Sequence, residues 1–290
     1  MIHSFHRDAP PLSVPPHLER FAALVSQTPE SIPLAEATLE IARGEYPGLD
    51  VRGYLERMDG LVRDAVRADP GRHAPADVRL QALNQVLFQD AGFSGNLGDG
   101  ADPRNSYLND ALDRRTGLPV ILSVIYLEVG ARLGLRLAGV GMPLHFIVRL
   151  LEEEPPLFID PFNKGTLMSQ EDCRALLHRV SAGKVELQPE HLHPCSGRRI
   201  LARILRNLKA IYVKDRDMAR ARRVVDQILI VQPEAVAEIR DRGMMAYQSL
   251  LFEQAVADLE LYLDLAPEAR DARTIRAQVQ SLRRLVPAFN

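Results

Sequence analysis

The sequence of 290 residues lacks the features that mark several large classes of protein. Only two cysteines occur, Cys173 and Cys195, so we expect no disulfide framework and a reducing, cytoplasmic compartment. No apolar run reaches the roughly 18 residues of a membrane span. The N-terminal residues lack the basic start and the apolar core of a signal peptide. These absences predict a cytoplasmic protein with no membrane partner.

Charge and glycine patterns argue against two further classes. The formal net charge is -2, which gives no overall attraction to nucleic acid. The glycine-rich segment 92–100 lacks the Lys-Ser/Thr ending of a phosphate-binding loop. A locally basic stretch lies at 198–223, without an aromatic platform or a DNA-reading motif. We interpret its arginines as a solvated helical face or as a contact with an acidic site on the first domain, and we expect no nucleic-acid partner.

The first two thirds of the chain mix helical and strand patterns. Apolar spacing of about 3.6 residues predicts helices at 17–29, 33–46, 51–68 and 77–89. The segment from Pro119 to Leu133 is apolar on all sides except at Glu128 and Arg132, which can pair, so we expect a buried central helix. Short strands are predicted at 136–141, 145–150 and 157–160. The predicted fold class is α+β, with one central helix packed on a small antiparallel sheet.

The C-terminal third is predicted to be all helical and repetitive. Four positions recur after 34 residues: Ala221 as Ala255, Val225 as Leu259, Leu229 as Leu263 and Pro233 as Pro267. This period is typical of the tetratricopeptide (TPR) helix pair. Two pairs and a capping helix at 270–286 fall short of the repeats that a free array needs, so we expect them to dock against the first domain. The predicted domains are an extended arm at 1–16, a first domain at 17–190 and a helical domain at 198–290.

Three positions around the central helix have the order of a Cys-His-Asp triad. Pro119 opens the helix, His145 is placed on the first of two strands after it, and Asp160 ends the second. If Leu150 pairs with Leu157, His145 and Asp160 become diagonal neighbours on one face of the hairpin. A hydrogen bond between them would then orient the imidazole. Proline has no nucleophilic atom, which excludes covalent acyl transfer from this position.

Five segments carry a resemblance to a known family. They are EIARGEYPGLDV at 40–51, LNQVLFQDAGFSGN at 83–96, NSYLNDALDRRTGLPVILSVIYLEVGARLGL at 105–135, HFIVR at 145–149 and FIDPFNKG at 158–165. With the TPR-like tail, the chain resembles the bacterial SirB-type family, which joins a transglutaminase-like domain to C-terminal TPR helices. The resemblance implies a transglutaminase-like core, of the papain-like cysteine-protease type, followed by an all-α TPR-like domain.

The same resemblance assigns family positions to the three residues. In active transglutaminase-like enzymes the central helix opens with G-x-C, and that cysteine falls on Pro119, the family's His on His145 and its Asp on Asp160. The SirB-type family itself tends to carry proline or another non-nucleophile there. The resemblance therefore implies a pseudoenzyme whose triad positions are vestigial.

Two other residues are candidates for a replacement nucleophile. Ser123 lies one helical turn past Pro119, but inside the helix and away from the favourable end of the helix dipole, so we favour a packing role. Cys173 follows the hairpin in a predicted helix, and we interpret it as a small buried hydrophobe. We therefore expect no residue to be catalytic.

The roles of the surrounding polar residues stay open. His145 and Asp160 fit a structural pair, part of a binding pocket, or a catalytic pair. Asn105, Ser123 and Asn163 are possible residues of the same pocket, although each also fits a structural role.

The run HLHPC contains potential zinc ligands. His191, His193 and Cys195 alternate along it, but a fourth ligand and the paired C-x-x-C spacing are missing. We interpret the run as a linker between the domains, and we expect neither a metal nor another cofactor.

Two hypotheses follow from the sequence. The first is a non-catalytic and possibly regulatory module that binds a protein or peptide through its TPR-like helices and the cleft of the first domain. The alternative is a hydrolase without a thiol, in which His145, oriented by Asp160, acts as general base on a water. That alternative requires a pocket open to solvent beside His145.

Overall fold

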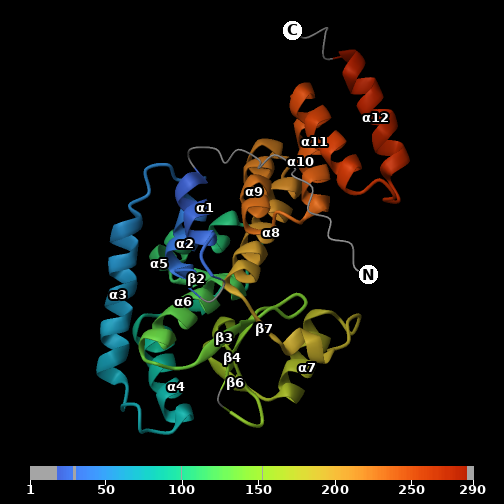
Figure 1. Cartoon of the computed structure of the whole chain (residues 1–290). Coiled ribbons are helices and arrows are strands. Elements are labelled where there is room, and N and C mark those ends of the chain that lie inside the picture. Colours follow the sequence, from blue (N-terminus) through green and yellow to red (C-terminus); the bar gives the residue numbers. More distant parts are fainter. Residues whose placement is uncertain (1–17, 29–30, 99, 152, 286–290) are drawn as a thin grey trace.

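The computed structural model describes residues 18–28, 31–98, 100–151 and 153–285, and the predicted arm at 1–16 lies outside them. Figure 1 shows helices grouped around α6 (Pro119–Arg132), a small sheet below, and a column of helices that rises from α8 (Gly197–Lys214) to α12 (Ala272–Leu285). The chain therefore has the α+β first part and the helical second part that the sequence predicts.

The first part opens with helices whose bounds follow local signals. They are α1 (Glu19–Val25), α2 (Leu34–Arg43), α3 (Val51–Ala68), α4 (Ala76–Asn84), continued by a π-helical turn (Gln85–Asp90), and α5 (Leu108–Arg114). α3 has the predicted bounds because the Asp50 carboxylate caps it, accepting the Gly53 N–H at 3.0 Å. The segment before α5 is a 3-10 turn, Pro103–Ser106, so Asn105 lies in that turn and does not cap a helix.

α6 is the buried centre of the first part. It packs against α2, α3 and the sheet, and Pro119 occupies its first position, where a missing N–H leaves no helical hydrogen bond unmade. Within the described residues the predicted Glu128–Arg132 pair is replaced by contacts outside α6. Glu128 accepts the Ala35 N–H at 2.9 Å, and Arg132 pairs with Asp59. Both charges therefore tie α6 to its neighbours.

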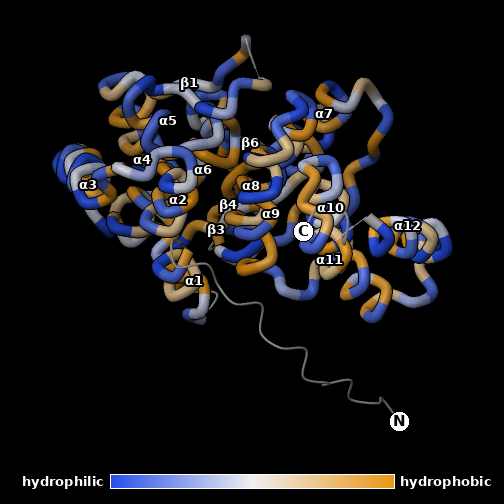
Figure 2. Tube along the Cα trace, turned by 90° about the horizontal axis from the view of Figure 1, so that it is seen from above, coloured by the Kyte–Doolittle hydropathy of each residue, from blue (hydrophilic) through white to orange (hydrophobic). Residues whose placement is uncertain are grey.

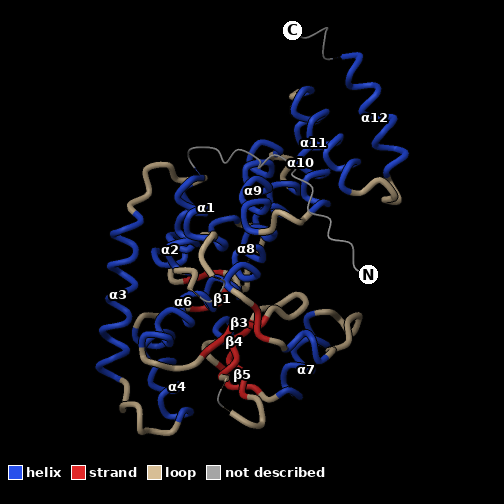
Figure 3. The backbone as a smooth tube through the Cα atoms, in the orientation of Figure 1, coloured by secondary structure: helices blue, strands red, loops and turns tan. Residues whose placement is uncertain are grey.

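The main sheet of the described residues is antiparallel and lies between α6 and α7 (Gln170–Val180), as Figure 3 shows. Its strand order is β6 (Thr166–Met168), β5 (Leu157–Asp160), β4 (Ile147–Leu150), β3 (Leu137–Val140) and β7 (Pro194–Cys195). A separate parallel bridge joins β1 (Ser94–Gly95) to β2 (Thr116–Gly117). The predicted register is confirmed, since Leu150 pairs with Leu157.

The second part consists of paired helices and a last single helix. α8 pairs with α9 (Met218–Val231), α10 (Val236–Gln248) pairs with α11 (Phe252–Leu265), and α12 packs on α11. The repeat alanines Ala221 and Ala255 are fully buried within these pairs, where their small side chains allow close approach. The predicted docking is confirmed: α8 packs on α2 and α6, and both parts share one apolar core. Figure 2 shows α8 in the middle of the molecule, with α3 and α12 at opposite edges.

Candidate functional site

His145 and Asp160 form a buried pair at the end of the β4–β5 hairpin. The His145 Nε2 and the Asp160 Oδ2 are 2.9 Å apart, and both side chains are almost fully enclosed. Phe162 stands edge-on to the imidazole, with 5.7 Å between the ring centroids. The hydrogen bond is the one that the hairpin register predicts. The placement of His145 differs, because β4 begins at Ile147 and His145 reaches Asp160 from the loop before it.

Asp160 is surrounded by hydrogen-bond donors. Its Oδ1 accepts the backbone N–H groups of Phe162 and Asn163, and its Oδ2 accepts the Asn163 amide at 2.6 Å. Burial alone would raise the pKa of the Asp160 carboxyl, but hydrogen bonds from His145 and Asn163 outweigh it and hold the pKa below its ordinary value. The ionised carboxylate can only accept, so the His145 Nε2 carries the proton. The imidazole Nδ1 has no partner among the described residues, and in the neutral ring it carries the lone pair.

A cavity of about 290 Å³ lies beside His145, between the first part and α8. We call it the His145 cavity. The start of α6, the loop before β4 and one face of α8 form its walls, and the lining residues are Gly100, Leu118, Pro119, Val120, Leu144, His145, Phe146, Arg203, Asn207, Ala210 and Ile211. Its volume is close to the lower end of the range for small-molecule sites, about 300–1,000 Å³. The site therefore depends on the docking of the second part.

The predicted nucleophile position faces this cavity but offers no nucleophile. Pro119 and His145 line the same space, as the triad order predicts. Among the described residues that line it, none carries a thiol, a hydroxyl or a carboxylate. The only titratable groups on the wall are the His145 imidazole and the Arg203 guanidinium. The described wall can bind and can exchange a proton, but it has no atom for covalent attack.

The two cysteines lie elsewhere. Cys173 is a fully buried residue of α7, and burial, with the carboxylates of Asp172 and Asp160 nearby, raises the pKa of its thiol to about 12. Cys195 lies in β7, and burial raises the pKa of its thiol as well. A raised pKa keeps both sulfurs as thiols at neutral pH, and the thiolate is the nucleophile. Cys173 thus has the surroundings predicted for a small buried hydrophobe.

The three possible pocket residues are placed differently from the prediction. Asn105 is buried behind the start of α6, where its carbonyl accepts the Leu118 N–H at 2.9 Å, and Ser123 is buried inside α6. Neither belongs to the lining of the His145 cavity. Asn163 holds Asp160 and borders a second hollow, on the α7 side of the pair. None of the three therefore contacts the His145 cavity directly, and Asn163 is connected to it through Asp160 and His145.

Sequence reasoning missed the part of the site that comes from α8. Arg203 and Asn207 lie four residues apart, on one helical face, and both line the cavity. The sequence places Arg203 only within a basic stretch. Its spacing to Asn207 is the signal that could have marked a polar face, but which face of α8 meets the first part depends on tertiary packing.

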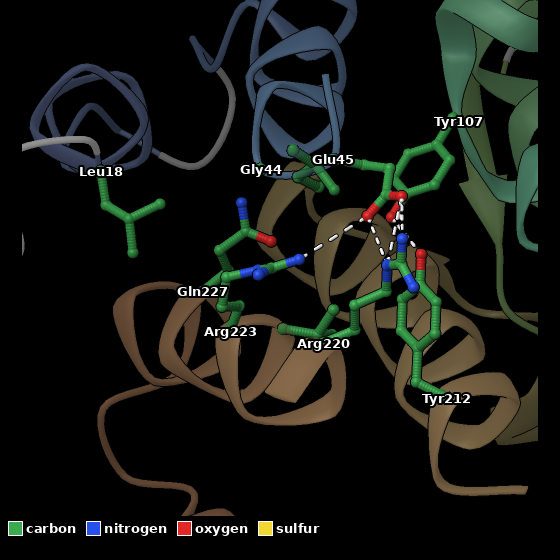
Figure 4. A pocket seen from close by; sticks show the side chains of 10 residues that line it. Leu18, Gly44, Glu45, Tyr107, Tyr212, Arg220, Arg223 and Gln227 are labelled. Carbon is green, nitrogen blue, oxygen red and sulfur yellow. Dashed lines mark hydrogen bonds and ion pairs between the residues drawn. The ribbon is translucent and has the colours of Figure 1, made fainter. Parts of the chain in front are cut away.

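A second contact between the two parts is closed by paired polar groups. The hydroxyls of Tyr107 and Tyr212 are buried and 2.8 Å apart. Arg220 forms a fork on Glu45, with nitrogen–oxygen distances of 2.8 and 2.9 Å, and Arg223 approaches the same carboxylate at 3.7 Å. Figure 4 shows these side chains converging: Glu45 follows α2, Tyr107 directly precedes α5, and the others come from α8 and α9. We call this set the paired contact. Its Glu45 carboxylate is an acidic site on the first part that binds arginines of the basic stretch, which is one of the two interpretations drawn from the sequence.

A metal centre and a membrane span both lack support in the described part of the chain. No group of three or more His, Cys, Asp or Glu side chains is placed there to hold a metal ion. In the HLHPC run, His191 Nδ1 accepts the Gln188 N–H at 3.1 Å and Cys195 pairs with Gly139 in the sheet. No described helix combines the length and the apolar character that crossing a membrane requires.

Comparison with known proteins places both parts of the chain. A model of the transglutaminase-like superfamily matches residues 51–206, and a tetratricopeptide repeat model matches residues 208–280. The first match ends inside α8, so it includes Arg203 of the cavity wall but not Asn207, Ala210 or Ile211.

Similar proteins occur in several bacteria. The chain is 38% identical over 263 residues to a "UPF0162 protein" of Xylella fastidiosa (strain 9a5c), which covers 90% of this chain and 93% of that protein. It is 28% identical over 254 residues to "UPF0162 protein YchA" of Escherichia coli (strain K12), with 86% and 93% covered. It is 28% identical over 244 residues to "Protein SirB1" of Salmonella typhimurium, with 84% and 89% covered. No solved structure matches the chain.

Proposed function

The chain belongs to the transglutaminase-like superfamily, in the family of UPF0162 and SirB1 proteins that adds C-terminal TPR helices, and from this we propose that it is a non-catalytic protein- or peptide-binding module. We propose a cytoplasmic location and the domain limits 17–190 and 198–290. A regulatory role is a further part of the proposal, suggested by the resemblance to the SirB-type family.

One observation carries the proposal. By the family resemblance, Pro119 stands where active transglutaminase-like enzymes have their cysteine, and it lines a cavity together with His145. The described wall keeps hydrogen-bonding groups and apolar surface but offers no covalent nucleophile. Such a wall suits recognition, and TPR helices commonly present a surface to a partner. The pseudoenzyme interpretation rests on this combination.

Crosslinking from the native host tests the proposal with a matched pair of variants. Ala210→Trp adds a large side chain at an exposed position on the cavity wall, and Val213→Trp adds the same side chain at an exposed position of α8 outside it. We expect wild type and Val213→Trp to capture the same defined partner, and Ala210→Trp to lose it. If all three proteins capture nothing and the purified protein turns over a peptide or amide, the proposal fails.

The hydrolase alternative keeps one specific observation in its favour. His145 lines the cavity, and ionised Asp160 fixes the imidazole tautomer so that Nδ1 can accept a proton. In this alternative the base would activate a water against an ester or amide held in the cavity. Activity that persists after thiol blocking but disappears in His145→Ala would support it. Absence of turnover over a panel of esters and amides would reject it.

A further inference from the structure

The His145 cavity contains a positive charge that the described protein leaves without a counter-charge. Arg203 is partly buried, and its one hydrogen bond within the described residues is a long one, from Nη1 to the Met142 carbonyl at 3.4 Å. No described carboxylate forms an ion pair with it, and burial lowers the pKa of the guanidinium. An arginine stays charged at neutral pH even so, and a buried charge without a partner is unfavourable. An anion in the cavity would complete the contact.

The other polar groups around Arg203 also suit an anion. Asn207 lies one turn further along the same face of α8, and its side-chain amide makes no hydrogen bond within the described residues. The first turn of α6, at Pro119 and Val120, borders the cavity, and a helix N-terminus carries a partial positive charge. No described residue of the lining is acidic. The charge of Arg203 and the donors beside it therefore favour a negative group on this part of the wall.

The rest of the wall is apolar, and one of its residues is strained. Leu118, Phe146 and Ile211 present hydrocarbon surface to the cavity. Leu144 joins them with a φ of 61°, a left-handed conformation that is unfavourable for a leucine, and it is 61% exposed. A strained, exposed leucine on a cavity wall gains little from protein packing. Such strain is found at sites that hold a ligand.

We propose that the His145 cavity binds the C-terminal carboxylate of a partner polypeptide whose last residue is apolar. Arg203 forms the charge-assisted contact with the carboxylate, Asn207 adds a hydrogen bond, and the wall that includes Leu144 takes the last side chain. This proposal rests on the peptide-binding function proposed above and names the part of the peptide that is recognised. A chain end fits a cavity of about 290 Å³ better than an internal acidic residue does, because an internal residue needs room for the chain on both sides.

The test uses two pools of randomised four-residue peptides that differ only at the C-terminus, one with a free carboxylate and one amidated. The full-length protein is immobilised and the retained peptides are quantified. We expect the free-acid pool to be retained at least about tenfold over the amide pool, with apolar last residues enriched, because a charge-assisted hydrogen bond has this order of effect. Arg203→Gln should abolish the preference, and Arg203→Lys should keep part of it.

Two further variants separate loss of the site from loss of the fold. Arg199→Gln removes the same charge from an exposed position of α8 outside the cavity and should behave as wild type. Ala210→Trp obstructs the cavity without a change of charge and should abolish retention. Equal retention of both pools would overturn the carboxylate proposal and leave peptide binding intact, with internal acidic residues as the recognised group. Retention of neither pool would also overturn it, and host crosslinking would then decide the proposed function separately.

Discussion

The second part contacts the first in two places, and these differ in whether their arginine has a carboxylate partner. In the paired contact, Arg220 meets the Glu45 carboxylate through two nitrogens, and the buried hydroxyls of Tyr107 and Tyr212 satisfy each other. In the His145 cavity, Arg203 has a single long bond to a carbonyl within the described residues. Buried polar groups are normally paired. The difference indicates that the first contact holds the two parts together and that the second is shaped for a ligand.

The largest expected effect tests whether the two contacts belong to one folding unit. Leu208 lies on α8, which carries both Tyr212 and Arg203, and it is fully buried in the shared core. Leu208→Ala should lower the free energy of unfolding by about 2–5 kcal/mol. Urea unfolding followed by circular dichroism should show one transition. Two separate transitions would contradict this, because the two contacts would then belong to parts that unfold independently.

The next largest effect concerns the His145–Asp160 pair beside the cavity. Since hydrogen bonds hold the pKa of Asp160 below its unfolded value, the carboxylate stabilises the fold at pH values above about 4. This contribution is lost as the pH falls through the folded pKa. Asp160→Asn should cost about 1.5–3 kcal/mol at neutral pH and should lessen the loss of stability below pH of about 4.

Acid-unfolding curves of matched variants check this sign. Asp264 is an exposed residue of α11, so Asp264→Asn serves as the control and should leave the curve of the wild type nearly unchanged. If the Asp160→Asn variant lost stability in acid as steeply as the wild type does, the ionised Asp160 carboxylate would not be stabilising the fold as proposed.

Tyr107→Phe measures the paired contact itself. It leaves the buried Tyr212 hydroxyl without its partner, so we expect a loss of about 1–3 kcal/mol. Tyr54→Phe is the control, because the Tyr54 hydroxyl bonds to Asp113 in a more exposed place and should cost less. Equal losses in denaturant titrations would mean that burial adds nothing at the paired contact.

The smallest expected effect is a gain. Leu144 and Leu250 are both exposed leucines with left-handed φ values, 61° and 60°, but only Leu144 lines the cavity. Asparagine tolerates this conformation better, so each Asn variant should gain about 0.5–1 kcal/mol. Retention of free-acid peptides should fall in Leu144→Asn alone. A loss of stability in that variant would show that Leu144 is held by packing and not strained for a ligand.

The sequence predicted what depends on local pattern. The apolar run of α6, the 34-residue repeat and the Leu150–Leu157 register follow from periodicity, and the His145–Asp160 bond follows from that register. The family resemblance supplied the meaning of Pro119. These features are fixed by neighbours in the chain or by one hairpin, which is why a single sequence is enough to predict them.

The partners of α6 and the α8 wall of the cavity depend on how the helices pack together, which no local sequence pattern encodes. Glu128 and Arg132 were expected to pair with each other, but in the packed structure Glu128 accepts the Ala35 N–H and Arg132 pairs with Asp59. The role of Arg203 depends on which face of α8 meets the first part, and the cavity exists only after that contact forms. Asn105 and Ser123 were possible pocket residues that also fitted a structural role, and both are buried outside the lining of the cavity.

The most direct test of the account compares the two arginines in one experiment. Arg203→Gln and Arg220→Gln each remove one charge, and both the free energy of unfolding and the retention of free-acid peptides are measured for each. Arg220→Gln should lose about 1 kcal/mol, as for a partly exposed ion pair, and should keep peptide retention. Arg203→Gln should keep or slightly gain stability and should lose retention. If Arg203→Gln is instead destabilised like Arg220→Gln and retains peptides as wild type does, the division between a holding contact and a binding cavity is contradicted.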